Sequence, residues 1–434
     1  MRLELATYPV KQVQWSHQTC YRDGLLEIDK AELLATVLED KKIVSADLDL
    51  ALPGEETRIV NVRDIVEARI KVSGPGCVFP GILGPVETVG DGRTHRLSGM
   101  TVVVSATYRP TILSGTAAQN SSLIDMWGPL GKATPFGSTL NVVLVIKLLD
   151  GVTELEAHAA IQLAEFKVAR RLAETTRELA TDETEVFETQ EVDPSLPRVV
   201  YIDSFLTNWH APHSLVAYYG LPIRESLPTY IHPNEYLDGA LTKDTRIGSG
   251  EYTYTWEWMN KGIILRLLRE HGKRLNFLGV ILQRTRFEAE HGKQVTAACA
   301  AQMAKLLKAE GVIVTRTVMS GANLVDVMLT VQACEKRGLK TVFLSPEWGG
   351  RDGTEPPFVF TVPEADAMVS TGSTDREYRL PAPRKLIGVK PGELIQLYAG
   401  DQWISPSEEL TMDDTCLAGT TDWWGAGKYT RVQY

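Results

Sequence analysis

The sequence is poor in cysteine, and its few cysteines form no framework. Only five occur in 434 residues, namely Cys20, Cys77, Cys299, Cys334 and Cys416, and none of them has C-x-x-C spacing. An odd count without paired spacing gives no support to a zinc ribbon or a set of disulfides, and it favours a reducing compartment. We therefore expect a cytoplasmic protein.

Long apolar runs and an excess of basic charge are also missing. The clearest apolar runs, such as residues 142–146, are far shorter than the ~20 residues that cross a bilayer, and the first 16 residues lack the apolar segment of a signal peptide. The 45 basic and 55 acidic residues give a formal charge of −10, and the basic ones are scattered. We therefore expect neither a membrane nor a nucleic acid as partner, but a small-molecule substrate.

The pattern of apolar residues divides the chain into four parts. Residues 1–180 contain short β-branched runs at 58–62, 68–72 and 100–105, and end in a helical pattern over 155–179. Residues 181–197 are acidic, rich in threonine and interrupted by proline, which predicts a linker. The pattern predicts a β-rich N-terminal domain (1–180), the linker, an α/β domain (198–390) and an aromatic-rich C-terminal tail (391–434).

Residues 198–390 alternate between short buried strands and amphipathic helices. The strand-like runs cover 199–202, 277–282, 312–318 and 341–344. One helical face between them would carry Val295, Cys299, Met303 and Leu306, and the next would carry Leu324, Val327, Met328 and Val331. Strand–helix alternation of this length predicts an α/β fold with a doubly wound, mainly parallel sheet.

Ligands of such sheets bind beyond the carboxyl ends of the strands, which draws attention to residues 347–352. There Glu347 and Arg351 directly follow a predicted buried strand. Arg351 could hold a substrate carboxylate through two hydrogen bonds, with an acid nearby for proton transfer. The alternative is a loop in which Arg351 and Asp352 simply pair with each other.

Histidines near the same edge leave a metal site open as an alternative. His210 and His213 lie in one proline-containing segment, and His232 lies in another, three residues before Glu235. Imidazole and carboxylate ligands suit zinc, but proline breaks the helical spacing of common zinc enzymes, so any site would be formed by loops. Solvated or hydrogen-bonded histidines are the structural alternative.

Residues 251–258 form an unusual aromatic run. If this run is extended, Tyr252, Tyr254, Trp256 and Trp258 lie on one face of a strand. Electron-rich rings arranged in this way could surround a quaternary ammonium. The alternative is a strand that packs its aromatic face on the core.

Several motifs together resemble a known family. They are MRLEL at residues 1–5, FPGIL at 79–83, GRTHRLSGM at 92–100, TPFGSTLN at 134–141, HPNEYLDGA at 232–240, HGK at 271–273, GGRDG at 349–353 and STG at 370–372. In this order, over about residues 1–390, the chain resembles the α/β proprotein of component B of glycine, sarcosine and betaine reductases.

The resemblance implies a covalent carbonyl chemistry. Proproteins of this family cut themselves before a cysteine that becomes an N-terminal pyruvoyl group, and this group forms an imine with the substrate amine. A selenocysteine on a separate subunit then attacks the neighbouring carbon and expels the amine.

The present sequence departs from the family at the cleavage junction. Counted from Asp238, the junction falls near Thr245 and Arg246, and no cysteine lies between Cys77 and Cys299. Arginine cannot become a pyruvoyl group, and Ser249 is the only nearby residue that could replace the cysteine. We therefore predict an uncleaved chain without pyruvoyl.

The expected protein is then a substrate-binding subunit that acts with a second subunit carrying Sec or Cys, in a hetero-oligomer that cleaves C–N bonds. In this interpretation Arg246 and Arg351 hold a carboxylate, with Glu347 beside them, while Tyr254, Trp256 and Trp258 surround a cationic nitrogen. His232 and Glu235 line the former junction and take part in proton transfer. No cofactor is expected. The alternatives are a metal-dependent hydrolase or C–N lyase using His210, His213 and His232, and a non-catalytic scaffold subunit.

Overall fold

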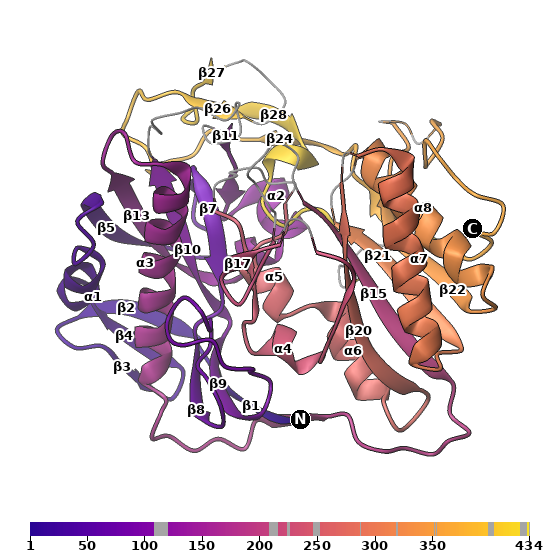
Figure 1. Cartoon of the computed structure of the whole chain (residues 1–434). Coiled ribbons are helices and arrows are strands. Elements are labelled where there is room, and N and C mark those ends of the chain that lie inside the picture. Colours follow the sequence, from indigo (N-terminus) through magenta and orange to yellow (C-terminus); the bar gives the residue numbers. More distant parts are fainter. Residues whose placement is uncertain are drawn as a thin grey trace.

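The chain folds as an α/β protein with two halves that lie side by side (Figure 1). The computed structural model describes residues 1–434 except 108–119, 208–215, 224–225, 246–251, 287, 318–319, 351, 353, 398–402, 426–431 and 434. Among the described residues, none of the helices is long and apolar enough to span a membrane.

The N-terminal half is built on two four-stranded sheets. One has the order β14 (Thr184–Glu188), β1 (Arg2–Pro9), β9 (Gly92–Ser98) and β8 (Arg69–Ser73), and the other has the order β5 (Ile43–Ala51), β13 (Leu140–Leu148), β10 (Met100–Thr107) and β7 (Val62–Val66). A three-stranded sheet of β2 (Gln12–Ser16), β4 (Leu25–Asp29) and β3 (Cys20–Arg22) leads into the helix α1 (Lys30–Val37). The predicted abundance of strands is confirmed.

The long helix α3 (Glu154–Glu174) covers the N-terminal sheets and contributes most of its apolar residues to their core. It begins where Thr153 Oγ1 accepts the N–H of Glu156, whose own carboxylate accepts the N–H of Thr153. This reciprocal capping satisfies two backbone donors of the first turn. The predicted helix is confirmed, although it ends at Glu174, five residues earlier than expected.

The C-terminal half contains a seven-stranded sheet. Its order is β18 (Thr229–Ile231), β20 (Asn276–Thr285), β15 (Arg198–Leu206), β21 (Gly311–Thr317), β22 (Lys340–Glu347), β23 (Met368–Ser373) and β29 (Val432–Gln433). The five central strands are parallel, and the two edge strands run antiparallel to them. The predicted mainly parallel sheet is therefore confirmed.

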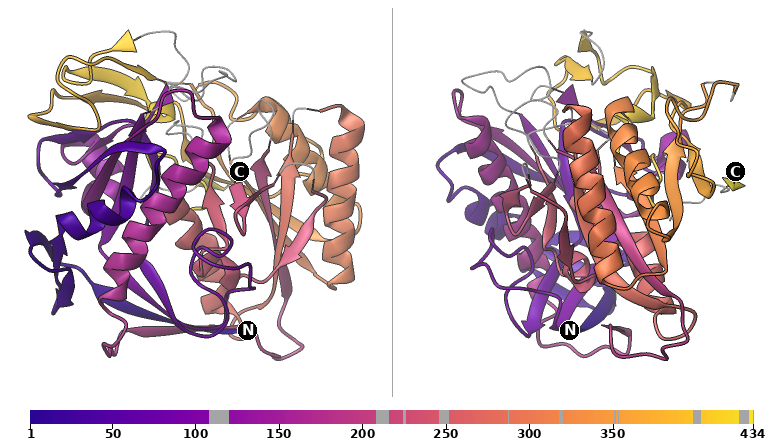
Figure 2. Two further views of the ribbon diagram at one scale, coloured as in Figure 1. Left: turned by 60° about the vertical axis from the view of Figure 1, so that its left-hand side comes forward. Right: turned by 45° about the vertical axis from the view of Figure 1, so that its right-hand side comes forward.

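Helices α7 (Glu290–Leu306) and α8 (Gly321–Glu335) cover one face of this sheet, as the right-hand view of Figure 2 shows. On α8 the predicted apolar face is confirmed, because Leu324, Val327, Met328 and Val331 are all buried. The other face of the sheet packs on the N-terminal half and on α4 (Asn234–Leu237) and α6 (Gly262–Glu270).

The predicted apolar face of α7 is wrong. Val295 is 40% exposed and Leu306 is 73% exposed, whereas the buried positions are mainly Ala297, Ala300, Ala301 and Ala304. Small alanine side chains let α7 approach α8 and the sheet closely, so burial follows the alanine row rather than the largest apolar residues.

Several segments of the second half return to the first. Strand β25 (Lys385–Ile387) pairs with β6 (Thr57–Ile59), which also pairs with β12 (Ile124–Asp125). In the tail, β26 (Ile395–Leu397) pairs with β11 (Asn120–Ser121) and β27 (Trp403–Ile404), and β28 (Leu410–Asp413) pairs with β24 (Glu377–Leu380). These yellow segments lie above the N-terminal sheets in Figure 1. The segment expected as a linker contains β14, which extends the first sheet through β1.

Candidate functional site

The second part of the aromatic run is helical and not extended, so the four rings do not share one face of a strand. Residues Thr255–Met259 form the short helix α5, which turns Trp256 and Trp258 in different directions. The helix begins here because the Glu257 carboxylate accepts the N–H of Tyr254 at 2.8 Å, while Asp64 accepts the N–H of Thr255 at 2.9 Å. Carboxylates that accept the free N–H groups of a first turn stabilise a helix start.

Two rings of the run already face cations of the chain itself. Tyr254 is fully buried and lies under Lys243, whose Nζ is 3.8 Å from the ring centroid. Trp258 contacts Lys261, whose Nζ is 4.4 Å from the Trp258 centroid and 4.0 Å from that of Trp424. An aromatic cage therefore exists, but its occupant is an internal ammonium.

Lys261, which directly precedes α6, pairs with Asp203 of the central strand β15. The Asp203 carboxylate pairs with Lys261 and also accepts the hydroxyl groups of Tyr201 and Tyr236. Both rings lie within 5.3 Å of Lys261 Nζ. A buried charge is tolerated only with partners of this kind. We therefore interpret Lys261 and its partners as part of the core.

Trp256 has a different environment and lines a cavity of about 340 Å³. The walls come from α2 (Gly128–Ala133), η2 (Pro135–Ser138), α5 and residues 419–424. The lining residues are Lys132, Ala133, Thr134, Pro135, Ser138, Trp256, Glu257, Asn260, Gly262, Gly419, Thr420, Thr421, Asp422, Trp423 and Trp424. We call this space the indole cavity.

The indole cavity combines three tryptophans with a few charged groups. Trp423 and Trp424 of the tail face the same space as Trp256, together with Glu257, Asp422 and Lys132. Burial raises the pKa of Glu257 to about 8. Aromatic walls with two acids suit a small organic cation, and a single lysine offers a contact for a carboxylate on the same molecule.

A cluster of buried ionisable groups lies on the other side of α5. Burial lowers the pKa of Lys243 to about 8 and raises that of Asp64 to about 6, while the pKa of Glu165 lies well above its ordinary value. Within the described part of the chain, Lys243 Nζ and both carboxyl oxygens of Glu165 have no hydrogen-bond partner. Such groups are costly in a core and concentrate at functional sites.

Helix α3 presents a polar stripe to this cluster. His158, Gln162 and Glu165 follow one another at i, i+4 and i+7, and all three are buried. They face β19 (Leu241–Lys243) and the two residues after it: Gln162 donates to the carbonyl of Lys243 at 3.1 Å, and His158 Nδ1 accepts the N–H of Thr245 at 3.2 Å. We did not predict this stripe, although polar residues spaced along an apolar helix face are its sequence signal.

His232 and Glu235 lie at the start of α4, outside the lining of the indole cavity. His232 Nδ1 accepts the N–H of Asn234, and Nε2 lies 2.7 Å from Thr189 Oγ1. Burial lowers the pKa of His232 to about 4.

The Glu235 carboxylate accepts the hydroxyl groups of Tyr218 and Tyr219 and the N–H of His232. These contacts order the turn before α4. The predicted role of His232 and Glu235 in proton transfer stays a prediction.

Glu347 is the one other predicted site residue among those that the structure describes, and it lies outside the lining of the indole cavity. Glu347 ends β22, where its carbonyl accepts the N–H of Thr374. Arg246, Arg351, His210 and His213 lie outside the described residues. Among the residues that are described, no group of three His, Cys, Asp or Glu side chains could hold a metal ion.

These features define an α/β protein with an aromatic-lined cavity of about 340 Å³. Comparison with known proteins gives the family. The chain belongs to the glycine/sarcosine/betaine reductase component B subunits, whose family profile matches residues 1–431.

The relatives match over most of their length. The glycine reductase complex component B subunits alpha and beta of Acetoanaerobium sticklandii are 31% identical, with all of both chains covered. In Peptoclostridium acidaminophilum, the betaine reductase complex component B subunit alpha is 33% identical, covering 89% of this chain and 88% of the relative. The sarcosine reductase complex component B subunit alpha of that organism is 32% identical, with 90% of each covered. No solved structure shows a significant match.

Proposed function

We propose that the chain is the substrate-binding subunit of a component-B-like reductase complex and binds a small quaternary-ammonium or amino-acid-like substrate in the indole cavity. The observation that carries this proposal is the set of three indoles and two acids around a space of about 340 Å³. The substrate nitrogen lies among Trp256, Trp423 and Trp424, and its carboxylate contacts Lys132.

A quaternary nitrogen makes a pyruvoyl group unnecessary. A selenolate or thiolate of a second subunit attacks the carbon next to nitrogen and forms a C–Se or C–S bond. The C–N bond breaks, and its electron pair leaves with the nitrogen as a neutral tertiary amine. Because the leaving group needs neither an imine nor a proton, the binding subunit only has to position the substrate.

The residues at the family's cleavage junction do not fit a pyruvoyl group. Arg246 has neither the thiol nor the hydroxyl that such a group derives from, and Thr245 before it bonds to His158. The proposed protein therefore remains one chain and works in a cytoplasmic hetero-oligomer with a subunit that carries Sec or Cys.

Isothermal titration of the purified full chain with trimethylglycine tests this proposal. We expect Trp256→Ala to weaken binding about 5–30-fold, since a cation–aromatic contact contributes about 1–2 kcal/mol. Trp403→Ala is the matched control, because Trp403 is exposed and lies outside the cavity lining. Equal affinities of the Trp256 variant and the parent chain for trimethylglycine would contradict the placement of the substrate in the indole cavity.

A further inference from the structure

Lys261 places a positive charge beside one wall of the indole cavity. Its Nζ lies 4.0 Å from the ring centroid of Trp424, which lines the cavity, whereas Lys261 is not among the described lining residues. The side chain is fully buried at the turn between α5, which bears Trp256, and α6. This ammonium therefore acts on the contents of the cavity through the Trp424 ring and not by direct contact.

The groups around this ammonium fix its position. Asp203 of β15 pairs with Lys261, and the same carboxylate also accepts the hydroxyl groups of two buried tyrosines. The Trp258 ring is a further contact, with its centroid 4.4 Å from Lys261 Nζ. Because a buried charge is stable only beside such partners, the ammonium stays next to Trp424.

Contacts of its ring hold Trp424 in place. The residue is 6% exposed, and within the described part of the chain its Nε1 has no hydrogen-bond partner. Its ring packs on Lys261 and on Trp258, whose ring centroid lies 5.2 Å away. Lys261 therefore helps to hold this indole in the cavity wall, and a ligand meets only the part of the ring that these two side chains leave open.

A ring that already faces one cation attracts a second cation less strongly. The attraction comes from the negative charge on the faces of the ring, and the first cation draws on that charge. A ligand cation on the same indole would lie roughly 8 Å from Lys261 Nζ, a distance at which like charges in a protein still repel each other. Asp203 offsets part of this repulsion. Trp424 thus offers a ligand mainly apolar surface.

We propose that Lys261 is a positioning and specificity-determining residue of the indole cavity, which acts through Trp424. Its ammonium holds this ring in the wall and lowers the attraction of the ring for a cationic ligand. The cavity therefore distinguishes a quaternary nitrogen from an uncharged group of the same shape less strongly than its three indoles would without this charge. The inference rests on the proposed function, because it concerns how the same cavity selects its substrate.

Isothermal titration of the full chain with trimethylglycine and with 3,3-dimethylbutanoate tests this role. The second ligand has a carbon atom in place of the quaternary nitrogen and the same shape, so the ratio of the two dissociation constants measures the preference for a cation. Lys261→Met removes the charge and keeps the length of the side chain. We expect it to raise this preference about three- to tenfold. A purely structural role would weaken the binding of both ligands alike.

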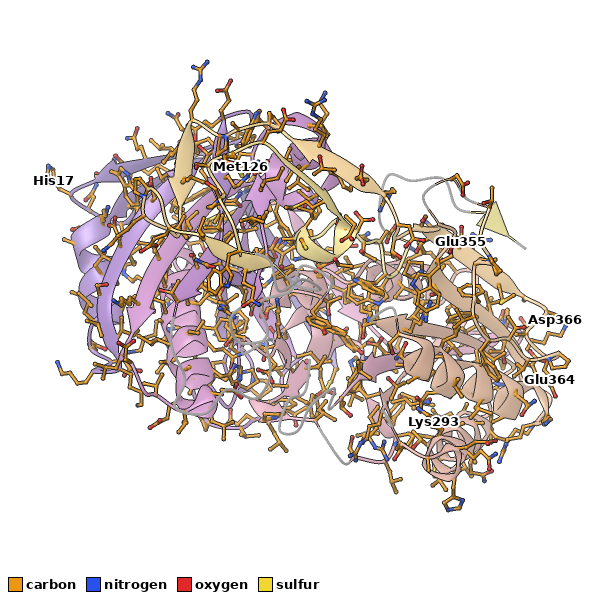
Figure 3. All side chains as sticks on the ribbon, turned by 90° about the horizontal axis from the view of Figure 1, so that it is seen from above. His17, Met126, Lys293, Glu355, Glu364 and Asp366 are labelled. Atoms are coloured by element: carbon orange, nitrogen blue, oxygen red, sulfur yellow. The ribbon has the colours of Figure 1, made fainter. Side chains whose placement is uncertain are left out.

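Two further variants complete the test. Lys261→Met/Asp203→Asn removes both charges of the pair but keeps an oxygen for the tyrosine hydroxyl groups, and it should show the same rise. Lys293→Met/Asp326→Asn is the matched control, because it removes another buried lysine–aspartate pair, between α7 and α8. Figure 3 shows Lys293 well away from Met126, which lies two residues before the cavity wall α2. The control should keep the preference of the parent chain.

Circular dichroism first shows which variants are folded. An unchanged or lower cation preference in the folded Lys261 variants, or an equal rise in the control, would overturn the inference. If both ligands bind and Trp256→Ala weakens the binding of trimethylglycine, such a result removes the role of Lys261 alone. If neither ligand binds the parent chain, the proposed function fails and the inference fails with it.

Discussion

At the scale of single residues, the candidate site contains buried ionisable groups, and burial shifts their pKa values toward neutral pH. Glu257 faces the indole cavity, while Lys243 and Asp64 lie behind it, and burial brings the three pKa values to about 8, 8 and 6. The pKa of Glu165, deeper still, is raised further by burial and by the negative charge of Asp64. A small change in pH or in bound charge will therefore change the protonation of this cluster.

We expect the affinity for trimethylglycine to rise as the pH rises from 6.5 to 9. The folded-state pKa of Glu257 is raised, so its carboxyl is mostly neutral below pH 8 and gains a negative charge above it. The two lysines that face Glu257 shift the charge in the same direction, because Lys243 and Lys261 both lose their positive charge near pH 8. Asp64 is already mostly ionised in this range, since its pKa is about 6. The expected gain is about tenfold, or about 1.4 kcal/mol.

Titrations at several pH values with Glu257→Gln check this origin. The variant keeps the shape of the side chain but cannot ionise, so its affinity should change much less with pH. If the affinity of the variant for trimethylglycine changes with pH as steeply as that of the parent chain, a group other than Glu257 causes the pH dependence.

At the scale of elements, sequence patterns predicted most where an apolar face decides the structure. The α3 helix, the buried face of α8 and the central parallel strands follow directly from spacing and length. The face of α7 could not be predicted from its largest apolar residues, because alanines at close helix contacts carry little hydrophobic signal.

The aromatic run shows why local pattern fails at the site. Alternating rings fit a strand, but Asp64 from β7, far away in sequence, accepts the first N–H of α5 and turns the run into a helix. Trp256, which we predicted as a substrate-binding residue, lines the indole cavity, and its role in binding stays a prediction. Its companions Trp423 and Trp424 come from the tail, and no sequence pattern linked them to residue 256.

Capping of α3 gives a prediction about this element alone. Replacing Thr153 with Ala removes the side-chain oxygen that accepts the N–H of Glu156, and we expect a loss of about 1 kcal/mol in the free energy of unfolding. Thr153→Ser keeps the oxygen and should remain within about 0.5 kcal/mol of the parent chain. Urea unfolding followed by circular dichroism measures both. Equal losses in the two variants would show that the cap does not hold this helix.

At the scale of the whole molecule, the two halves are joined by pairings between distant segments. Strand β25 extends the sheet of β6, and β26 pairs with β11, so the second half of the chain supports the first. Residues 419–424 then close the indole cavity. These contacts join residues hundreds of positions apart, which is why composition and periodicity alone did not predict where the tail would pack.

The segment around Thr245 links the strand that contacts α3 to the helix that bears Trp256. Strand β19 leads to Thr245, which His158 of α3 holds, and the helix that bears Trp256 begins ten residues later. A cut after Thr245 would break the covalent link between β19 and α5. The expectation that the chain stays whole rests on the residues at this junction.

Intact-mass spectrometry of the purified protein, combined with hydrazine labelling of carbonyl groups, tests directly whether the chain is uncleaved and lacks a pyruvoyl group. We predict one species of 48.0 kDa that takes up no label. Two fragments, with a carbonyl-blocked new terminus between Asp238 and Gly250, would contradict the proposed imine-free chemistry.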